Sequence, residues 1–205
     1  MKVLTRRPLL FLFLCFLPFG CDSLSDSPFP TRILMLGDSI TAGGHWQAWT
    51  GRADIINEGI GGNTSRHVLD RIDQVTWPSS GHLCFLMVGI NDIGGGAPQE
   101  EIVENIESIL LEIGERNITP ILQSVLLVGK EYPQADKVNG QIKLLNETLE
   151  ELALRQEIAF LDLNEVLTSE GFLIDRFTQD GIHLVEAGYK QWIDQILPII
   201  DQHGI

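Results

Sequence analysis

The sequence is poor in basic residues and in cysteine. It holds 14 Lys and Arg against 28 Asp and Glu among 205 residues, for a formal net charge of −14, and it holds three cysteines. Binding to a phosphate backbone needs Lys- and Arg-rich surfaces, so this acidity argues against a nucleic-acid partner. No G-x-S-x-G elbow, Walker A loop, H-E-x-x-H or paired-cysteine motif occurs. We therefore expect neither an ordinary α/β-hydrolase nor a P-loop or zinc enzyme, and we expect no metal or other cofactor.

The first twenty residues have the layout of a secretory signal peptide. Basic residues precede an apolar run from Leu9 to Leu17, and no acidic residue occurs before Asp22. The run is too short to read as a membrane-spanning helix. The pair Gly20-Cys21 that follows it resembles the site at which bacterial lipoproteins are cleaved and then acylated on the cysteine. We expect an exported bacterial lipoprotein held at the membrane through Cys21; a plain cleaved signal and an uncleaved anchor are the alternatives.

The remainder divides into a tether and one domain. Residues 21–31 are rich in Ser, Asp and Pro without periodicity, which is typical of a flexible linker. Residues 32–205 show no internal repeat and no further linker, and their length suits a single core. With Cys15 removed and Cys21 acylated, Cys84 is the remaining cysteine, so no disulfide is expected within one mature chain.

Short apolar runs alternate with amphipathic stretches throughout residues 32–205. The runs suit strands that are buried on both faces, and the stretches carry apolar residues at helical spacing. The runs are Ile33–Leu36, Ile55–Ile56, Leu83–Val88, Ile121–Leu122 with Val125–Val128, and Ile158–Leu161. The helical stripes are Val68, Leu69, Ile72 and Val75; Ile102, Ile106, Ile109 and Ile113; Val138, Ile142, Leu145, Leu149 and Leu152; and Trp192, Ile193, Ile196 and Leu197. This alternation predicts an α/β sandwich built on a parallel sheet.

Three residues predict where helices begin or end. Pro98 is expected at the first helical position, since Glu100 and Glu101 follow it and favour the positive end of the helix dipole. Asn63 can cap the helix that follows it. Pro198 is expected to bend or end the last helix.

Four polar, glycine-rich segments follow the predicted strands. They are residues 37–41, 57–64, 89–92 and 180–183. Ligands of parallel α/β sheets bind beyond the carboxyl ends of the strands, so we expect these segments to meet in one site. The segments at 94–96 and 128–136 are expected to flank it.

The residue types in these segments are those that acyl transfer from an ester requires. Ser39 can act as a nucleophile, and His183 can act as its base. Asp180 precedes His183 by three residues, so within one helical turn its carboxylate can reach the imidazole. The Ser39 and Gly62 backbone amides and the Asn91 side-chain amide can donate to an oxyanion.

The blocks GDSIT, GIGGNTS, VGIND and DGIHL resemble, in this order, the four blocks of the GDSL/SGNH hydrolases. The stretch Gly59–Ile72 is similar to platelet-activating-factor acetylhydrolase catalytic subunits and to bacterial thioesterase/lysophospholipase relatives. The resemblance implies a three-layer α/β/α sandwich with a flavodoxin-like parallel five-stranded sheet of order 2-1-3-4-5. It also implies Ser39 as nucleophile, Asp180 and His183 as acid and base, and Ser39, Gly62 and Asn91 as the oxyanion-hole donors.

We therefore expect a serine esterase or acylhydrolase that works without a cofactor through an acyl-serine intermediate. Its substrate would be a small-molecule, saccharide or lipid ester with a short or acetyl acyl group. One alternative is a surface lipoprotein that uses the fold as a carbohydrate- or host-binding module, which a fluorophosphonate probe would fail to label. The other is an O-acyltransferase with the same triad, which product analysis with an added alcohol acceptor would reveal.

Overall fold

The computed structural model describes residues 32–78 and 82–205. The expected signal segment, tether and lipidation site at Cys21 lie outside the described residues and stay predictions. Within the described part of the chain, no helix has the length and apolar character needed to cross a membrane. The same ranges contain no group of three or more His, Cys, Asp and Glu side chains that could hold a metal ion.

Five parallel strands form the central sheet, in the order β2-β1-β3-β4-β5. They are β1 (Ile33–Gly37), β2 (Ile55–Gly59), β3 (Leu83–Met87), β4 (Thr119–Gln123) and β5 (Ala159–Leu161). Gly37 at the end of β1 pairs with Gly59 of β2 and Met87 of β3. The predicted strand order is confirmed, and the loops after these three strands leave the sheet at the same level.

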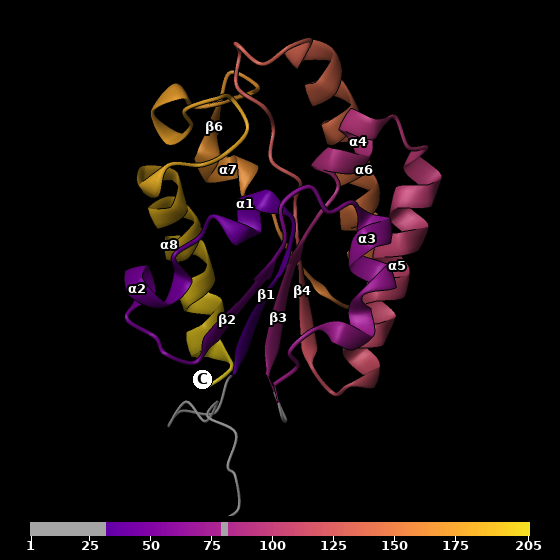
Figure 1. The fold of residues 1–205 in the computed structure, drawn as a ribbon, viewed down its shortest axis with the longest axis vertical. Coiled ribbons are helices and arrows are strands. Elements are labelled where there is room, and N and C mark those ends of the chain that lie inside the picture. Colours follow the sequence, from indigo (N-terminus) through magenta and orange to yellow (C-terminus); the bar gives the residue numbers. More distant parts are fainter. Residues whose placement is uncertain (1–31, 79–81) are drawn as a thin grey trace, which may run out of the picture.

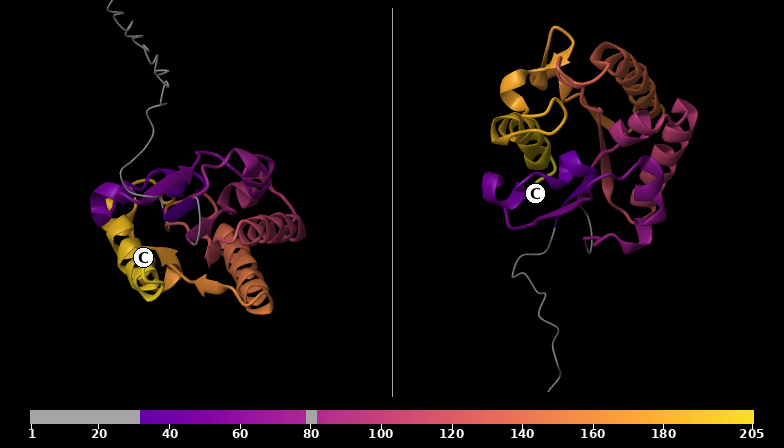
Figure 2. Two further views of the ribbon diagram at one scale, coloured as in Figure 1. Left: turned by 90° about the horizontal axis from the view of Figure 1, so that it is seen from below. Right: turned by 45° about the horizontal axis from the view of Figure 1, so that its top comes forward.

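Helices cover both faces of the sheet, which gives the expected three layers. Figures 1 and 2 show α3, α5 and α6 on one side and α2 and α8 on the other. The helices are α1 (Ser39–Ala42), α2 (Trp46–Thr50), α3 (Ser65–Asp70), α4 (Ile90–Gly95), α5 (Gln99–Glu115), α6 (Ala135–Arg155), α7 (Asn164–Leu167) and α8 (Glu186–Gln202), with short 3₁₀ turns at η1 (Ile72–Gln74) and η2 (Asp175–Phe177). A small antiparallel pair, β6 (Thr168–Ser169) and β7 (Phe172–Leu173), precedes η2.

The core lies between the sheet and these helices. Every residue of β1 and of β3 is buried, as predicted for strands covered on both faces. The stripes predicted for α5 and α6 are confirmed, because the residues that face the sheet are buried: Ile102, Ile106, Ile109, Ile113, Ile142, Leu145, Leu149 and Leu152. On the other face, Trp192 of α8 packs edge-on against Trp46 of α2 with ring centroids 4.8 Å apart.

The segment Val125–Val128 is buried but is not a strand, so its predicted assignment is wrong. The strand β4 ends at Gln123. The backbone amides of the segment instead donate to the side-chain oxygens of Asn139, Asn146 and Asn164, at 2.7–2.8 Å. An apolar run indicates that a segment is buried, but it does not indicate that the segment is a strand. Here side-chain amides take the place of a neighbouring strand as hydrogen-bond partners of the backbone.

The Pro98 prediction is wrong, and of the two effects expected of Pro198 an end of the helix is excluded while a bend stays a prediction. Pro98 is the N-cap of α5 and not its first helical residue, although Glu100 and Glu101 lie in the first turn as expected. Pro198 does not end α8, which continues beyond it to Gln202.

The stripe that begins at Val68 does not form one helix. The helix α3 ends at Asp70, and the 3₁₀ turn η1 follows it. The N-cap of α3 is Thr64 rather than Asn63: the Thr64 hydroxyl accepts from the His67 amide at 3.3 Å, and the His67 ring accepts from the Thr64 amide at 3.2 Å. The cap is thus a reciprocal pair one residue later than predicted.

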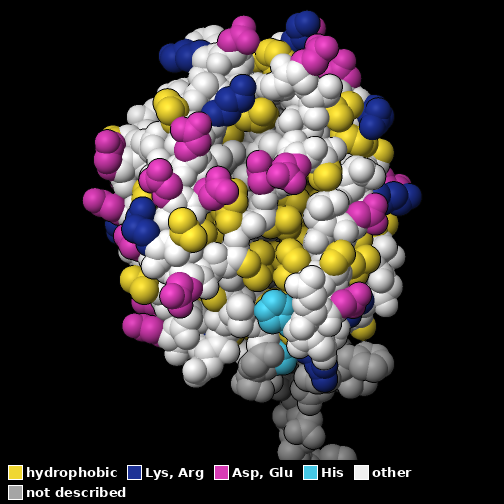
Figure 3. Space-filling view, turned by 180° about the vertical axis from the view of Figure 1, so that it is seen from behind, with side chains coloured by type: hydrophobic (Ala, Val, Ile, Leu, Met, Phe, Trp, Pro, Cys, Tyr) yellow, Lys and Arg dark blue, Asp and Glu magenta, His cyan; other side chains and the backbone are white. Residues whose placement is uncertain are grey.

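The surface reflects the acidic composition. Figure 3 shows Asp and Glu side chains spread over the face opposite to that of Figure 1, with apolar side chains gathered along its middle and Lys and Arg scattered among them. This face of the described residues presents no continuous basic area of the kind that a phosphate backbone needs.

Candidate active site

Ser39 lies on the tight turn between β1 and α1. It is the first residue of α1, and the Asp38 carboxylate caps this helix by accepting from the Ile40 amide at 2.9 Å. From the other direction, the Tyr189 hydroxyl of α8 donates to the Ile40 carbonyl at 2.7 Å. Two contacts therefore fix the turn, and they place the partly exposed Ser39 side chain at the carboxyl edge of the sheet.

The structure brings Ser39, His183 and Asp180 into one hydrogen-bonded chain. The Ser39 hydroxyl lies 3.0 Å from Nε2 of His183. Nδ1 of the same ring lies 2.7 Å from Oδ2 of Asp180. Residues 144 positions apart in the sequence thus meet in the arrangement in which an acid orients a base and the base faces a hydroxyl.

A loop of bends, not a helical turn, presents His183 to Ser39. The expected helical conformation is therefore wrong, although Asp180 reaches the imidazole as predicted. Oδ1 of Asp180 accepts from the Ile182 and His183 amides at 3.0 and 2.8 Å. The Thr178 hydroxyl donates to the His183 carbonyl at 2.8 Å and accepts from the Gly181 amide at 2.9 Å. Gly181 has φ +83°, which favours glycine. The sequence analysis does not predict a role for Thr178, which stands two positions before Asp180-Gly181, although Asp-Gly itself is a turn signal.

The ionised Asp180 fixes the tautomer in which Nε2 of His183 can accept a proton from Ser39. Burial alone would raise the pKa of Asp180, but hydrogen bonds from the His183 ring and from the His183 and Ile182 amides lower that pKa to about 2. Asp180 is therefore ionised at neutral pH and accepts from Nδ1–H of His183. Nε2 of the neutral ring then carries the lone pair and accepts from the Ser39 hydroxyl.

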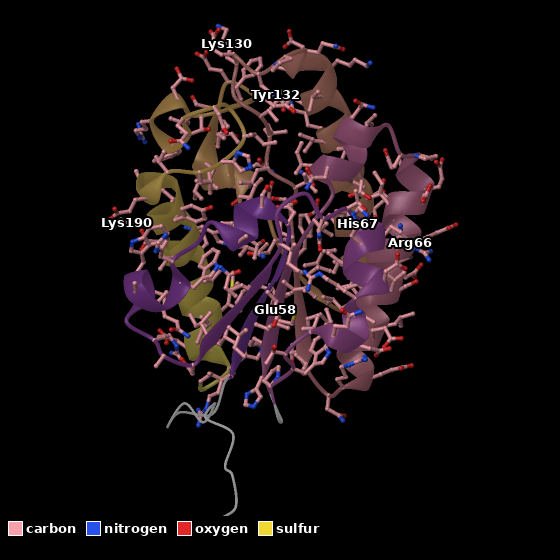
Figure 4. All side chains as sticks on the ribbon, viewed as in Figure 1. Glu58, Arg66, His67, Lys130, Tyr132 and Lys190 are labelled. Carbon is pink, nitrogen blue, oxygen red and sulfur yellow. The ribbon has the colours of Figure 1, made fainter. Side chains whose placement is uncertain are left out.

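The segment 129–134 flanks this loop. The Gly129 amide donates to the Gly181 carbonyl at 2.7 Å. A Cβ on Gly181 would lie 3.3 Å from Cβ of Tyr132, so the two loops pack closely. Figure 4 shows Tyr132 and Lys130 at the end of the molecule beyond the carboxyl ends of the strands. The dyad is still accessible, since the side chains of His183 and Asp180 are 42% and 44% exposed.

The three donors predicted for an oxyanion come from neighbouring segments. A Cβ on Gly61 would lie 4.0 Å from Cβ of Ser39, so the loop that carries Gly62 borders the serine. Gly62 has φ +77°, and within the described chain neither its amide nor that of Ser39 donates to another residue. Nδ2 of Asn91 donates one hydrogen to the Asn63 carbonyl at 2.9 Å and has a second hydrogen to offer.

Asn63 ties its loop to the sheet rather than capping α3. Its Oδ1 accepts from Nε of Arg71 at 2.8 Å. The same guanidinium donates to the Glu58 carbonyl at 2.7 Å and pairs with the Glu58 carboxylate at 3.6 Å. Figure 4 shows Glu58 over the strands and His67 on α3. Asn63 is thus engaged by its side chain and by its carbonyl, which leaves the cap to Thr64.

Comparison with known proteins agrees with this geometry. Residues 35–191 match the model of the GDSL-like Lipase/Acylhydrolase family, which is more than half of the chain. The chain belongs to this family. Hydrolysis of ester bonds is accordingly its class of activity. The matched range contains the Ser39 turn, the Gly62 and Asn91 segments and the loop of Asp180 and His183.

Relatives of this acylhydrolase include a yeast esterase and a bacterial thioesterase/lysophospholipase. It is 28% identical to the isoamyl acetate-hydrolyzing esterase of Saccharomyces cerevisiae, over 91% of this chain and 85% of that protein. It is 27% identical to thioesterase 1/protease 1/lysophospholipase L1 of Escherichia coli, over 63% and 66% of the two chains. The structure of a GDSL-like lipase from Bacteroides thetaiotaomicron superposes with a TM-score of 0.74 and 26% identity, over 84% of this chain and 89% of that one.

Asp38 should make the stability of this acylhydrolase depend on pH. Burial raises the pKa of Asp38 to about 6, against the opposing effects of the Ile40 amide and of His183. The folded state therefore holds a proton that the unfolded chain has lost between about pH 4 and pH 6, and stability falls as pH rises through that window. Asn caps helices as well as Asp does. The Asp38→Asn variant lacks this penalty. Its free energy of unfolding, relative to that of the wild type, should therefore rise by about 2–3 kcal/mol from pH 4 to pH 7, at about 1.4 kcal/mol per pKa unit.

Urea denaturation of the two proteins at pH 4, 5, 6, 7 and 8 measures this gain. The difference in unfolding free energy should grow up to about pH 6 and then level off. A difference that is the same at every pH would show that ionisation of Asp38 carries no penalty in the fold.

Proposed function

We propose that this acylhydrolase cleaves carboxylic esters through an acyl-serine intermediate on Ser39. His183 takes the Ser39 proton through Nε2 while the serine oxygen attacks the ester carbonyl. The oxyanion is stabilised by the Ser39 and Gly62 amides and by the Asn91 side chain. His183 then protonates the leaving alcohol. In the second step it removes a proton from a water molecule that attacks the acyl-serine, and it returns this proton to the Ser39 oxygen as the acid leaves. The observation that carries this proposal is the unbroken hydrogen-bonded chain from Ser39 through His183 to Asp180.

We further propose that the acyl group is short. The accessible His183 and Asp180 side chains support an open site, in which a long acyl tail would remain largely in water. Each CH₂ group left unburied forgoes roughly 0.8 kcal/mol of binding energy. The yeast relative is named for an acetate ester, which agrees with a small acyl group.

A series of p-nitrophenyl esters from acetate to long acyl chains, with acetylated saccharides alongside, tests the proposed substrate class. We expect kcat/KM to be highest for acetyl and other short acyl groups and to fall or stay level beyond them. A kcat/KM that rises steadily to the longest chains would contradict an open, short-acyl site.

Lipidation of Cys21 is a separate proposal that rests on the sequence before residue 32. Wild-type protein should take up radiolabelled palmitate and fractionate with membranes, and Cys21→Ala should do neither. Membrane association without label in the wild type would refute it.

A further inference from the structure

Asn91 and Asp92, which follow β3, bind two residues near the start of α3. These are Asn63, in the loop after β2, and Ser65, the first residue of α3. Asn91 donates from Nδ2 to the Asn63 carbonyl at 2.9 Å. Asp92 accepts the Ser65 amide on both carboxylate oxygens, at 3.0 and 2.9 Å, and the Ser65 hydroxyl at 2.6 Å. Asp92 is therefore adjacent in sequence to one proposed oxyanion donor, Asn91, and binds the start of the helix that follows a second donor, Gly62.

A third segment completes this network. Asn105 of α5 donates from Nδ2 to the Ser65 hydroxyl at 3.1 Å. Ser65, Asp92 and Asn105 are all buried. Because the Ser65 oxygen accepts from Asn105, its own hydrogen is directed to Asp92. Burial raises the pKa of Asp92 and the Ser65 hydrogen bonds oppose this effect, so the carboxylate depends on Ser65 for its stabilisation.

Gly62 has open space on the side where a Cβ would project, and its amide donates to no residue of the described chain. A Cβ built on Gly62 would meet no atom within 4 Å, and its φ of +77° is a conformation that glycine adopts freely. The position of its amide is therefore set by the anchors on either side. Before Gly62, the Ile60 amide donates to the Gly37 carbonyl at 3.1 Å. After it, Asn63 is held by Arg71 and Asn91, and Ser65 is held by Asp92.

We propose that Asp92 is a positioning residue that keeps the Gly62 amide and the Asn91 side chain at the separation an ester oxyanion requires. This inference rests on the proposed acyl-serine mechanism. Asp92 touches neither the serine nor the ester; it acts through Ser65 and through its neighbour Asn91. Misplacement of catalytic groups by about 1 Å can cost on the order of 10²-fold in rate.

The Asp92→Asn variant tests the proposal. Its side-chain NH₂ would face the Ser65 amide, so a donor would meet a donor where a carboxylate oxygen accepted. We expect kcat to fall about 10–100-fold with KM little changed, as for loss of transition-state stabilisation. The pH dependence of kcat should keep its midpoint, because His183 is untouched. A shifted midpoint would assign Asp92 to the base and overturn the proposal.

The matched control is Asp54→Asn. Asp54 is also a largely buried carboxylate with hydrogen-bonded partners, since it pairs with Arg52 at 2.7 Å, but it lies next to the amino end of β2. We expect its kcat to stay near the wild-type value. An equal loss in both variants would assign the effect to general destabilisation and overturn the proposal.

A double-mutant cycle with Asn91→Ala separates positioning from a merely structural role. If Asp92 acts through the oxyanion donors, Asp92→Asn should cost clearly less in the Asn91→Ala background than in the wild type, because neighbouring groups that work together are not additive. Additive losses would overturn the proposal. Should Asp92→Asn fail to fold, Ser65→Ala removes only the hydroxyl contact, and the same sub-additivity is expected of it. Activity that survives Ser39→Ala would instead refute the proposed function itself, so the two failures are distinguishable.

Discussion

Replacement of Ser39 by alanine should lower kcat by about 10⁴–10⁶-fold and abolish labelling by a fluorophosphonate probe. The Ser39 oxygen is the hydroxyl that faces Nε2 of His183, at 3.0 Å, and alanine leaves that base with nothing to activate. The loss should be confined to chemistry. Alanine suits the first turn of a helix, and Asp38 continues to cap α1, so the variant should fold normally.

Ser108→Ala is the matched control for this experiment. Ser108 lies on α5, and its hydroxyl donates to the Glu104 carbonyl of the same helix at 2.9 Å. This variant should keep wild-type activity and labelling. If folded Ser39→Ala protein still turned over esters or still reacted with the probe, another nucleophile would have to be found.

Replacement of Asn91 by alanine should lower kcat by about 10²–10³-fold while KM changes little, as for other oxyanion donors. The free Nδ2 hydrogen should meet the ester oxygen most strongly when that oxygen carries charge, so the interaction belongs to the transition state more than to the bound ester. Probe labelling should slow without stopping, because Ser39 and His183 are unchanged. Initial rates across substrate concentrations and the rate of labelling together measure this split.

Gln47→Ala is the control for the loss of a side-chain amide that binds a backbone carbonyl. Nε2 of Gln47 donates to the Ile55 carbonyl at 2.8 Å, at the amino end of β2. We expect no change in kcat. Near-normal kcat in a folded Asn91→Ala protein would leave Asn91 as a turn residue and reduce the oxyanion donors to the Ser39 and Gly62 amides.

The sheet could be predicted because its signals are local. The apolar runs that begin at Ile33, Ile55 and Leu83 each coincide with a strand, and glycine or polar residues mark their ends. Val125–Val128 carries the same apolar signal but pairs with asparagine side chains from 11 to 37 residues away. The composition of a short segment does not show whether its backbone will bond to a neighbouring strand or to side-chain amides from elsewhere in the chain.

The same difference separates the site residues from their supports. Ser39, Asp180 and His183 were predicted from motifs, and the structure brings their side chains together. Four supporting residues lie outside those predictions, because each acts through a contact that forms only when the chain folds. They are Thr178, Tyr189, Ser65 and Asn105. The Asn105 contact to Ser65, for example, joins residues 40 positions apart. The Asp180 loop consists of bends where the sequence predicts a helical turn, because a spacing of three residues fits both conformations.

Both ends of the described chain lie at the end of the molecule opposite to Ser39. The Arg32 amide bonds to the Asp54 carbonyl at 2.9 Å, and Arg52 donates to the Ile205 carbonyl at 3.2 Å, next to its ion pair with Asp54. Figure 1 places this end at the amino termini of the strands. A support or a fusion partner joined directly to Arg32 or to Ile205 is therefore attached on the side of the sheet away from Ser39. It leaves the edge that carries Ser39 and His183 free for the ester to approach.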